Sequence, residues 1–473
     1  MFVRNNWILA GFCMVLLLAP VAPGQENQPQ QPEDQNQGAP PIPAYRAPVQ
    51  GTTTSSTPLA GAQYLPVGGT DLTHSYWQPR FDLFGTFDTN PLQSPNGNEK
   101  NWTTWAAFDA GVDIHRISPT SELALGYLGG AMHSSDNAVE NGIVQALNFS
   151  DTFSFRRASI SLLDQLTYLP EQAFGFGGLG ALWQPVSPAG TLSTAFVPGQ
   201  YILGGRGQNL MNAFATQATF YRTRRSSLTL VGAYSLLHFF DSSQLDYREA
   251  IAQAGYNYQI SERNTIALLY TFSAVRYRNV NQSIDAHTPQ FSFARQVSDQ
   301  LSFQISAGPQ FAIYRIPTPN SSPLTSGTTN STDLYWYLNT ATTYHLRRLA
   351  LGLAYSRGVN GGSGVLQGSI ADVVTGSVTR QMSRTLSSGI TAGYARNYGL
   401  TVQATPKTQT YGYWFTGINL TRPIGSTLGF TFSYQLQYQS SNAAFCAGAT
   451  CGTNVIRNLI SVGINWRERP LML

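Results

Sequence analysis

Strict alternation of apolar and polar residues is the feature that most constrains how this chain can fold. Between Leu428 and Gln439 the sequence is LGFTFSYQLQYQ, with a large apolar side chain at every even position. Successive side chains of a β-strand point to opposite faces, so the segment predicts a strand with one apolar and one polar face. It exceeds the usual length of about five or six residues and suits a tilted strand crossing a bilayer, which needs about nine to eleven.

The same two-faced pattern recurs along the chain from about residue 80. The apolar positions of five further segments are Ile266, Leu268, Tyr270 and Phe272; Leu301, Phe303, Ile305, Phe311 and Ile313; Leu334, Trp336, Leu338 and Tyr344; Leu349, Leu351, Leu353 and Tyr355; Ile456, Ile460, Val462, Ile464 and Trp466. A sheet exposed to lipid must close on itself, because an unpaired edge would leave backbone polar groups in hydrocarbon. The pattern therefore predicts an all-β, antiparallel up-and-down transmembrane barrel.

Two kinds of connection alternate between these strands. The eight tight ones are centred on Ser118-Pro119-Thr120, Arg156-Arg157, Thr223-Arg224-Arg225, Ser261-Glu262-Arg263, Val297-Ser298-Asp299, Arg347-Arg348, Met382-Ser383-Arg384 and Pro423-Ile424-Gly425. Nine connections that are longer on average lie near residues 91–100, 135–141, 170–206, 241–246, 278–285, 317–332, 358–364, 400–408 and 441–453. The alternation predicts eighteen strands, with sixteen as the alternative, and places both barrel termini beside the tight turns, on the periplasmic side.

Composition agrees with a membrane barrel. Only 11% of residues are charged, against about 25% for ordinary soluble domains, while 12% are aromatic and 44 are glycine. No segment after residue 24 holds eighteen consecutive apolar residues, which argues against membrane-spanning helices. The net charge is +4, and residues 77–473 carry +6 once two arginines and four carboxylates upstream are set aside. This mild surplus does not indicate nucleic-acid binding and favours at most a weak preference for anions.

Three segments are expected. Residues 1–24 resemble a secretory signal peptide, with Arg4 before the apolar stretch 7–18 and small residues at 22–24; a membrane anchor is the alternative. Residues 25–76 include a Pro- and Gln-rich tract and are predicted to be disordered on the periplasmic side. Residues 77–473 form the barrel.

Two cysteines remain after removal of the signal peptide. Cys446 and Cys451 flank four residues in one predicted connection. In an oxidising compartment such a pair is expected to form a disulfide, with a metal site as the alternative; no histidine lies nearby in the sequence.

These features together resemble the general class of bacterial outer-membrane porins. The resemblance rests on the signal peptide, the alternating strands over about residues 80–473 and the regular sequence of short turns and longer loops. It implies a Gram-negative-type outer membrane, contact with outer-membrane lipid and with the barrel-assembly machinery, and leaves open whether three copies form a homotrimer. The sequence ends RERPLML after Trp466, whereas such barrels often end on an aromatic residue, so an equivalent assembly signal would be internal.

The connection 170–206 is the third of the longer ones and resembles, in position and length, the loop that narrows general porins. Phe174, Phe176, Trp183 and Tyr201 are candidate constriction residues, and a flexible surface loop is the alternative.

The segment GFGGLG at 175–180 matches a dinucleotide-binding pattern. No helix is indicated after it, and Pro185 and Pro188 follow, so a nucleotide site is rejected.

Polar residues of the strands are the candidates for lining a pore: Gln304, Gln310, Tyr335, Tyr337, Asn339, Gln435, Gln437, Asp151 and Asp164. Asp151 and Asp164 fall in phase with apolar neighbours, where carboxylates would be costly. A bulge that turns both into the lumen is one explanation, and an incorrect register is the other. The arginines near the tight turns suit either a ring at the channel exit or a solvated rim.

The predicted function is passive diffusion of small hydrophilic solutes through the outer membrane. Uncharged amides and phenols favour mostly neutral solutes such as sugars. The six histidines are scattered, and no spacing favours a catalytic pair, so the chain is not predicted to be an enzyme and no cofactor or metal is implied. Export of a polymer such as an exopolysaccharide, and a structural or adhesive barrel with a filled lumen, are the alternatives.

Overall fold

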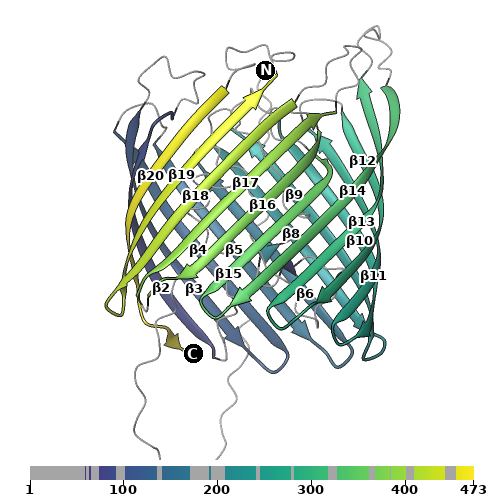
Figure 1. Cartoon of the computed structure of the whole chain (residues 1–473), viewed down its shortest axis with the longest axis horizontal. Helices are drawn as coiled ribbons and strands as arrows, with labels where there is room; N and C mark the ends of the chain where they lie inside the picture. The colour runs from purple at the N-terminus through teal and green to yellow at the C-terminus, as the bar shows by residue number, and fades with distance from the viewer. Residues whose placement is uncertain are drawn as a thin grey trace, which may run out of the picture. The chain divides into compact units, whose positions relative to one another are not determined.

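The structure is a computed structural model, and the residues it describes all belong to one compact unit, Pro43–Leu473. They are residues 59, 63–64, 74–91, 102–135, 141–170, 191–192, 208–240, 245–278, 282–317, 328–361, 368–383, 385–400, 410–442 and 454–473. Eighteen long strands form a closed antiparallel barrel, which confirms the predicted fold class and strand number (Figure 1). None of the described residues forms a helix long and apolar enough to span a membrane.

The long strands have the following bounds: β2 (Tyr76–Asp88), β3 (Thr103–Ile117), β4 (Ser121–Ser134), β5 (Gly142–Ser154), β6 (Ala158–Leu169), β8 (Asn209–Tyr221), β9 (Ser226–Phe239), β10 (Tyr247–Ser261), β11 (Asn264–Tyr277), β12 (Ser283–Gln296), β13 (Leu301–Pro317), β14 (Thr328–Leu346), β15 (Leu349–Asn360), β16 (Ser369–Gln381), β17 (Ser387–Gly399), β18 (Thr410–Ile424), β19 (Leu428–Ser441) and β20 (Asn454–Arg467). Three two-residue strands complete the set: β1 (Gln63–Tyr64), β7 (Thr191–Leu192) and β21 (Leu471–Met472).

The predicted connections are confirmed. Each of the eight tight turns lies at a junction between consecutive long strands, and the nine longer connections alternate with them. Some bounds differ: β18 continues through Pro423 and Ile424, and β14 begins at Thr328, inside the connection predicted at 317–332. The tight turns lie at the same end of the barrel as the C-terminus, which we call the turn end; the opposite end is the loop end (Figure 1). At the turn between β18 and β19, Gly425 has a φ of +77°, a conformation that side chains other than glycine rarely adopt.

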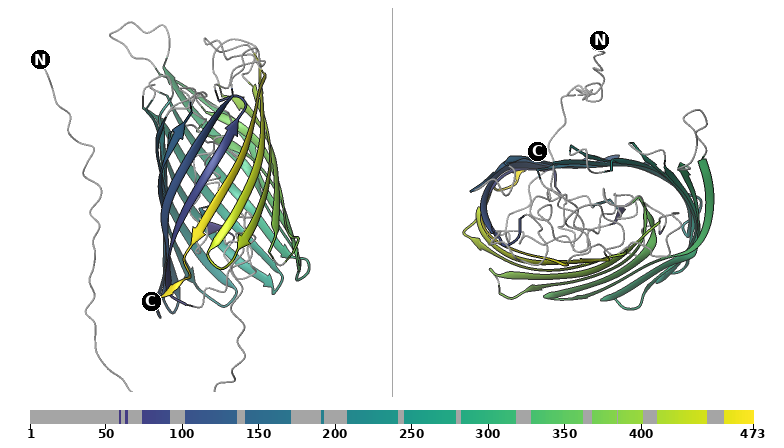
Figure 2. Two further views of the ribbon diagram at one scale, coloured as in Figure 1. Left: turned by 90° about the vertical axis from the view of Figure 1, so that its left-hand side faces the viewer. Right: turned by 90° about the horizontal axis from the view of Figure 1, so that it is seen from above.

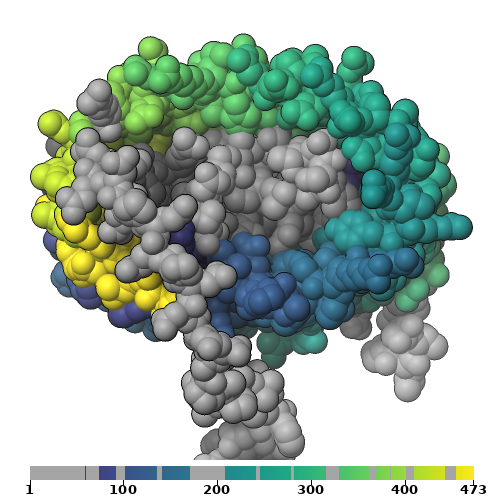
Figure 3. All heavy atoms as spheres, turned by 90° about the horizontal axis from the view of Figure 1, so that it is seen from below, coloured from purple at the N-terminus to yellow at the C-terminus, as the bar shows by residue number. Residues whose placement is uncertain are grey.

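Pairing between the first and last long strands closes the ring (Figure 2). Strand β2 pairs with β20 from Arg80↔Arg467 to Asp88↔Leu459, and with β3 on its other side. Strand β21 extends the seam, since Leu471 pairs with Trp77. Viewed from the turn end, the strands form an unbroken ring in the space-filling view (Figure 3). Closure leaves no unpaired edge, as a lipid-facing sheet requires.

The two faces of the wall differ as the alternation predicts. Outward side chains are large, apolar and exposed, with Leu83, Leu268, Leu334, Leu353 and Ile464 each more than half exposed. Inward side chains are mostly buried and include most of the buried polar residues of the strands. This arrangement, apolar outside and polar inside, is that of an outer-membrane barrel.

Candidate functional site in the barrel lumen

Seven of the nine residues predicted to line a pore lie on the inward face of the wall. They are Gln304, Gln310, Tyr335, Tyr337, Asn339, Gln435 and Gln437. Several also support the wall. Gln310 is 5% exposed, and its Oε1 accepts a hydrogen bond from the backbone N–H of Val359 at 2.9 Å. Gln437 lies directly opposite Arg457 on the neighbouring strand.

Asp151 and Asp164 lie on the outward face, which corrects the prediction that they line the lumen. The β5–β6 register pairs Asp151 with Leu162 and Asp164 with Phe149, and it runs without a shift. No bulge turns these carboxylates inward, so they keep the phase of their apolar neighbours.

Hydrogen bonds on the outward face explain how these two carboxylates are accommodated. Ser121 Oγ donates to Asp151 Oδ1 at 3.0 Å, and Asn212 Nδ2 donates to Asp164 Oδ1 at 2.7 Å. Such bonds offset part of the cost of placing a carboxylate toward hydrocarbon.

A cluster of charged side chains, which we call the charged wall, lies on the inward face beside the closure seam. It consists of Arg80, Asp82, Asp109, Asp113 and Arg467. Asp82 lies directly opposite Asp109, and Arg80 directly opposite Arg467. Two residues along β2, about 7 Å, separate the arginine pair from the aspartate pair. Groups of both signs therefore face the lumen within a short distance of each other.

Local contacts hold the charged wall in place. Asn465 Nδ2 donates to Asp82 Oδ1 at 2.6 Å. A Cβ added at Gly130 would lie 1.9 Å from Asp109 Oδ1, and one at Gly111 would lie 3.0 Å from Arg80 Nε. A backbone oxygen would also lie 2.4 Å from the added Cβ at each position, that of Phe108 at Gly130 and that of Tyr127 at Gly111, so both positions require glycine.

A histidine and a carboxylate extend the charged wall toward the turn end. His115 Nε2 and Glu122 Oε1 are 3.1 Å apart, and His115 Nδ1 is 3.2 Å from the backbone oxygen of His74. His115 is fully buried, whereas the side chain of Glu122 is 55% exposed. Both ring nitrogens are engaged, so the imidazole has a fixed orientation and joins β3 to β4.

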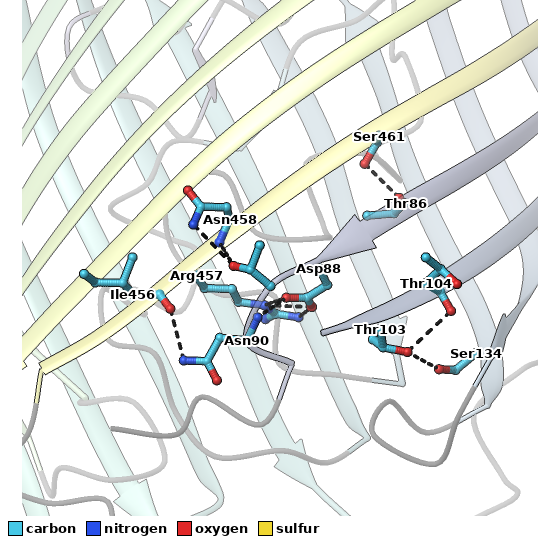
Figure 4. Close-up of polar contacts among 11 residues, drawn as sticks. Thr86, Asp88, Asn90, Thr103, Thr104, Ser134, Ile456, Arg457, Asn458 and Ser461 are labelled. Atoms are coloured by element: carbon cyan, nitrogen blue, oxygen red, sulfur yellow. Dashed lines mark hydrogen bonds and ion pairs between the residues drawn. The ribbon is translucent and has the colours of Figure 1, made fainter. Parts of the chain in front are cut away.

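At the loop end of the seam, an ion pair links the first and last long strands (Figure 4). Arg457 donates to both carboxylate oxygens of Asp88, with Nε at 3.1 Å from Oδ1 and 3.0 Å from Oδ2. Both side chains are essentially buried. Thr86 and Ser461 hydroxyls, 2.8 Å apart, form the next contact down the seam. Bidentate arginine–carboxylate geometry fixes the register as well as the charge.

Opposite the seam in strand order, the inward face of the loop end is aromatic and aliphatic. Tyr247, Tyr277, Ile284 and Tyr314 belong to one buried cluster there. The hydroxyl of Tyr277 donates to the backbone oxygen of Gly361 at 2.6 Å. Gly361 directly follows β15, so the chain leaves this strand toward the inward face of β10 and β11. The sequence patterns did not predict this approach.

Part of the segment upstream of the barrel also contacts the inward face. Leu59 packs against Ala267 and Leu269 of β11. Nearby in sequence, Gln63 and Tyr64 pair with Leu192 and Thr191 as strands β1 and β7. These contacts connect residues 59 and 63–64 to β11 and to the third longer connection.

The remaining predicted site residues lie outside the described residues. They are the constriction candidates Phe174, Phe176, Trp183 and Tyr201, and the cysteines Cys446 and Cys451.

Charge is sorted between the two faces of the described strands. The inward face carries seven carboxylates and three arginines: Asp82, Asp88, Asp109, Asp113, Glu122, Glu249 and Asp333, with Arg80, Arg457 and Arg467. The other arginines of these strands lie on the outward face or beside the turns. The inward face of the described strands is therefore formally negative although the whole chain is positive.

A period-two signal for these inward charges is present in the sequence but went unused. Arg80, Asp82 and Asp88 share one phase of β2, whereas Phe81 and Leu83 share the other. Following charge as well as hydropathy along each strand would have identified the charged wall.

Neither a protein-family model nor a curated protein sequence matches this chain. Solved structures with a similar fold are outer-membrane proteins. OccAB1 of Acinetobacter baumannii is 11% identical with a TM-score of 0.44, over 84% of this chain and 97% of that one. OpdF (OccK2) of Pseudomonas aeruginosa, solved with glucuronate, is 12% identical with a TM-score of 0.41, over 84% and 98%. The unliganded ferric citrate transporter FecA is 9% identical with a TM-score of 0.43, over 81% and 63%. Identities and TM-scores this low support no functional argument.

Proposed function

We propose that the barrel is an outer-membrane channel for passive diffusion of small hydrophilic solutes, and that it favours neutral and cationic solutes over anions. The observation that carries the proposal is the inward face, where amides, tyrosines and a surplus of carboxylates line a barrel of eighteen strands. A barrel of about sixteen to eighteen strands is wide enough to enclose an aqueous channel. Carboxylates in such a channel attract cations and repel anions.

The charged wall can act on a passing solute through its electric field. Arg80, Asp82, Asp109 and Asp113 are each at most 6% exposed, so they offer a solute little direct contact. Conduction requires binding that is favourable enough for entry and weak enough for release, and a field that acts without direct contact favours weak binding. The aromatic cluster across the barrel is buried as well and packs the wall on that side.

A second candidate is a barrel whose lumen is filled. Leu59 on the inward face of β11, and the pairing of β1 with β7, favour this alternative. A segment held inside the barrel would reduce conductance or abolish it.

Planar-bilayer recording of the purified protein tests the proposal. Open-channel steps, together with liposome swelling in neutral sugars, are the expected result. Complete silence of the intact protein would contradict it. A variant lacking residues 58–66 then separates the alternatives, because conductance gained on deletion supports a filled lumen. Silence in both forms, together with a polymer-secretion defect in cells lacking the protein, would support export.

A further inference from the structure

Arginines cluster on the outward face of the wall at the loop end. Six of them, which we call the arginine belt, are Arg248, Arg276, Arg278, Arg315, Arg357 and Arg396. They belong to strands β10, β11, β13, β15 and β17 or, for Arg278, follow β11 directly. Outward arginines are costly in hydrocarbon and favourable at the level of lipid headgroups, so their position along the strands is informative.

Outward aromatic residues accompany the belt. On β15, Arg357 follows Tyr355 by two residues, and on β17, Arg396 follows Tyr394 by two residues, about 7 Å along the strand. On β14, Trp336 is half exposed, and the Arg357 guanidinium carbon lies 4.3 Å from its ring centroid. Aromatic rings at this level mark the boundary between hydrocarbon and headgroups. On β17, the Arg396 guanidinium carbon lies 5.0 Å from the ring centroid of Tyr398, which follows it toward the loop end. The arginines therefore lie within this boundary region.

One aspartate on a central strand holds two arginines from its neighbours. Asp285 of β12 forms ion pairs with both, its Oδ1 lying 2.6 Å from Arg276 Nη1 of β11 and its Oδ2 3.5 Å from Arg315 Nη2 of β13. The Asp285 side chain is 10% exposed, whereas those of Arg276 and Arg315 are 46% and 54% exposed. The carboxylate is thus covered, whereas about half of each arginine side chain remains exposed on the outward face.

The same arrangement recurs on β15, β16 and β17. Asp372 of β16 accepts from Arg357 Nη1 at 2.7 Å and lies directly opposite Arg396 in the β16–β17 register. The hydroxyl of Tyr355 also donates to Asp372, at 2.9 Å. Asp285 thus contacts two arginines, whereas Asp372 pairs with Arg357 and has Arg396 directly across from it on β17.

Positive charge remains in excess. The belt's six arginines face three outward aspartates, Asp246, Asp285 and Asp372. Arg248 lies directly opposite Arg276 across β10–β11, and no described carboxylate forms an ion pair with Arg248. Like charges placed directly opposite destabilise a sheet, so an anion between them would relieve the repulsion.

We propose that the arginine belt binds the phosphate groups of a lipid headgroup. Guanidinium forks match phosphate oxygens in bidentate geometry, and they do so more strongly where water is partly excluded. A lipid satisfies both parts of this surface, because its acyl chains cover the exposed apolar side chains below the belt while its phosphates reach the arginines. The site concerns lipid around the barrel and is independent of what passes through the lumen.

Native mass spectrometry of the purified full-length protein with added diphosphoryl lipid A tests this site. The wild-type protein is expected to retain the lipid through delipidation, and Arg248→Gln/Arg278→Gln to lose at least tenfold in apparent affinity. This variant leaves the Arg276–Asp285–Arg315 contacts intact. Arg248→Lys/Arg278→Lys is expected to lose less, because charge remains. A folded barrel is verified in each case by heat-modifiable migration on gels.

The matched control removes two exposed arginines at the turn end, Arg224→Gln/Arg347→Gln, and is expected to bind lipid A like the wild type. Equal loss in the control and the belt variant would show attraction to overall charge and overturn the site. So would wild-type affinity in the belt variant, or no retention by the wild type. Full competition by equimolar inorganic phosphate would assign the belt to a free anion instead of a lipid.

Discussion

The buried pair of Asp88 and Arg457 is the single contact on which the loop end of the seam depends most. Removing one partner of a buried ion pair leaves the other charge unpaired, which costs about 3 kcal/mol or more. We expect Arg457→Gln to lower the free energy of unfolding by about that amount, measured by denaturant unfolding in detergent. Arg422→Gln, which removes an exposed arginine of β18, is the control and should change little.

Removing both charges of the pair separates the effect of charge on stability from the effect of side-chain shape. The double variant Asp88→Asn/Arg457→Gln keeps amide groups at both positions and removes both charges. We expect it to be more stable than Arg457→Gln alone. If Arg457→Gln unfolds like the wild type, the ion pair does not hold the seam.

Glycine at position 130 is a second requirement at the residue scale. A Cβ there would lie 2.4 Å from the backbone oxygen of Phe108 as well as against Asp109, so the wall would have to shift. We expect Gly130→Ala to cost about 1–3 kcal/mol, as overpacking does. At Gly85, no atom lies within 4 Å of an added Cβ, so Gly85→Ala is the control. Equal unfolding midpoints for the two variants would contradict the requirement.

At the scale of elements, hydropathy with a period of two in six segments, together with the alternation of tight and longer connections, was enough to predict the number and order of the long strands. It works because one face of each strand meets hydrocarbon, and a shift of one residue would expose the wrong face. The same signal placed Gln310 and Gln437 inward. It also put Asp151 and Asp164 in phase with their apolar neighbours. Only the bulge suggested to turn them into the lumen is wrong, because hydrogen bonds to neighbouring side chains let single carboxylates remain outward.

Contacts between distant elements could not be predicted from strand periodicity. The hydrogen bond from Tyr277 to Gly361 and the packing of Leu59 on β11 join segments far apart in the sequence. No local pattern encodes such pairings. The charged wall is different, because alternation along each strand does place its side chains inward. Hydropathy alone, however, does not distinguish these charged residues from other polar residues.

The two ends of the barrel are expected to face opposite sides of the membrane, with the turn end in the periplasm. Cysteines placed at Phe240, at the loop end, and at Ser383, in a tight turn, test this in a Cys446→Ser/Cys451→Ser background. A membrane-impermeant maleimide should label Phe240→Cys on whole cells, and Ser383→Cys only after the outer membrane is disrupted. Labelling in the reverse order would show the opposite orientation.

On the scale of the whole molecule, the wall separates charge between its two surfaces. Carboxylates are in excess on the inward face, and arginines are in excess on the outward face at the loop end. Each surface then suits its surroundings, an aqueous channel in one case and anionic headgroups in the other. A net charge of +4 therefore says little about the field a solute would meet.

The ion selectivity of the channel reports the electric field in the lumen. With a potassium chloride gradient across a planar bilayer, the reversal potential of the wild-type channel should indicate a preference for potassium. Asp82→Asn/Asp109→Asn removes two opposed carboxylates of the charged wall and leaves Arg80 and Arg467 facing the lumen. The preference should fall by about twofold or reverse, because the local charge becomes positive.

Asp299→Asn, in a turn and 94% exposed, removes a charge outside the lumen and should leave the reversal potential unchanged. Anion preference in the wild type, or equal shifts in both variants, would show that inward carboxylates do not set the selectivity.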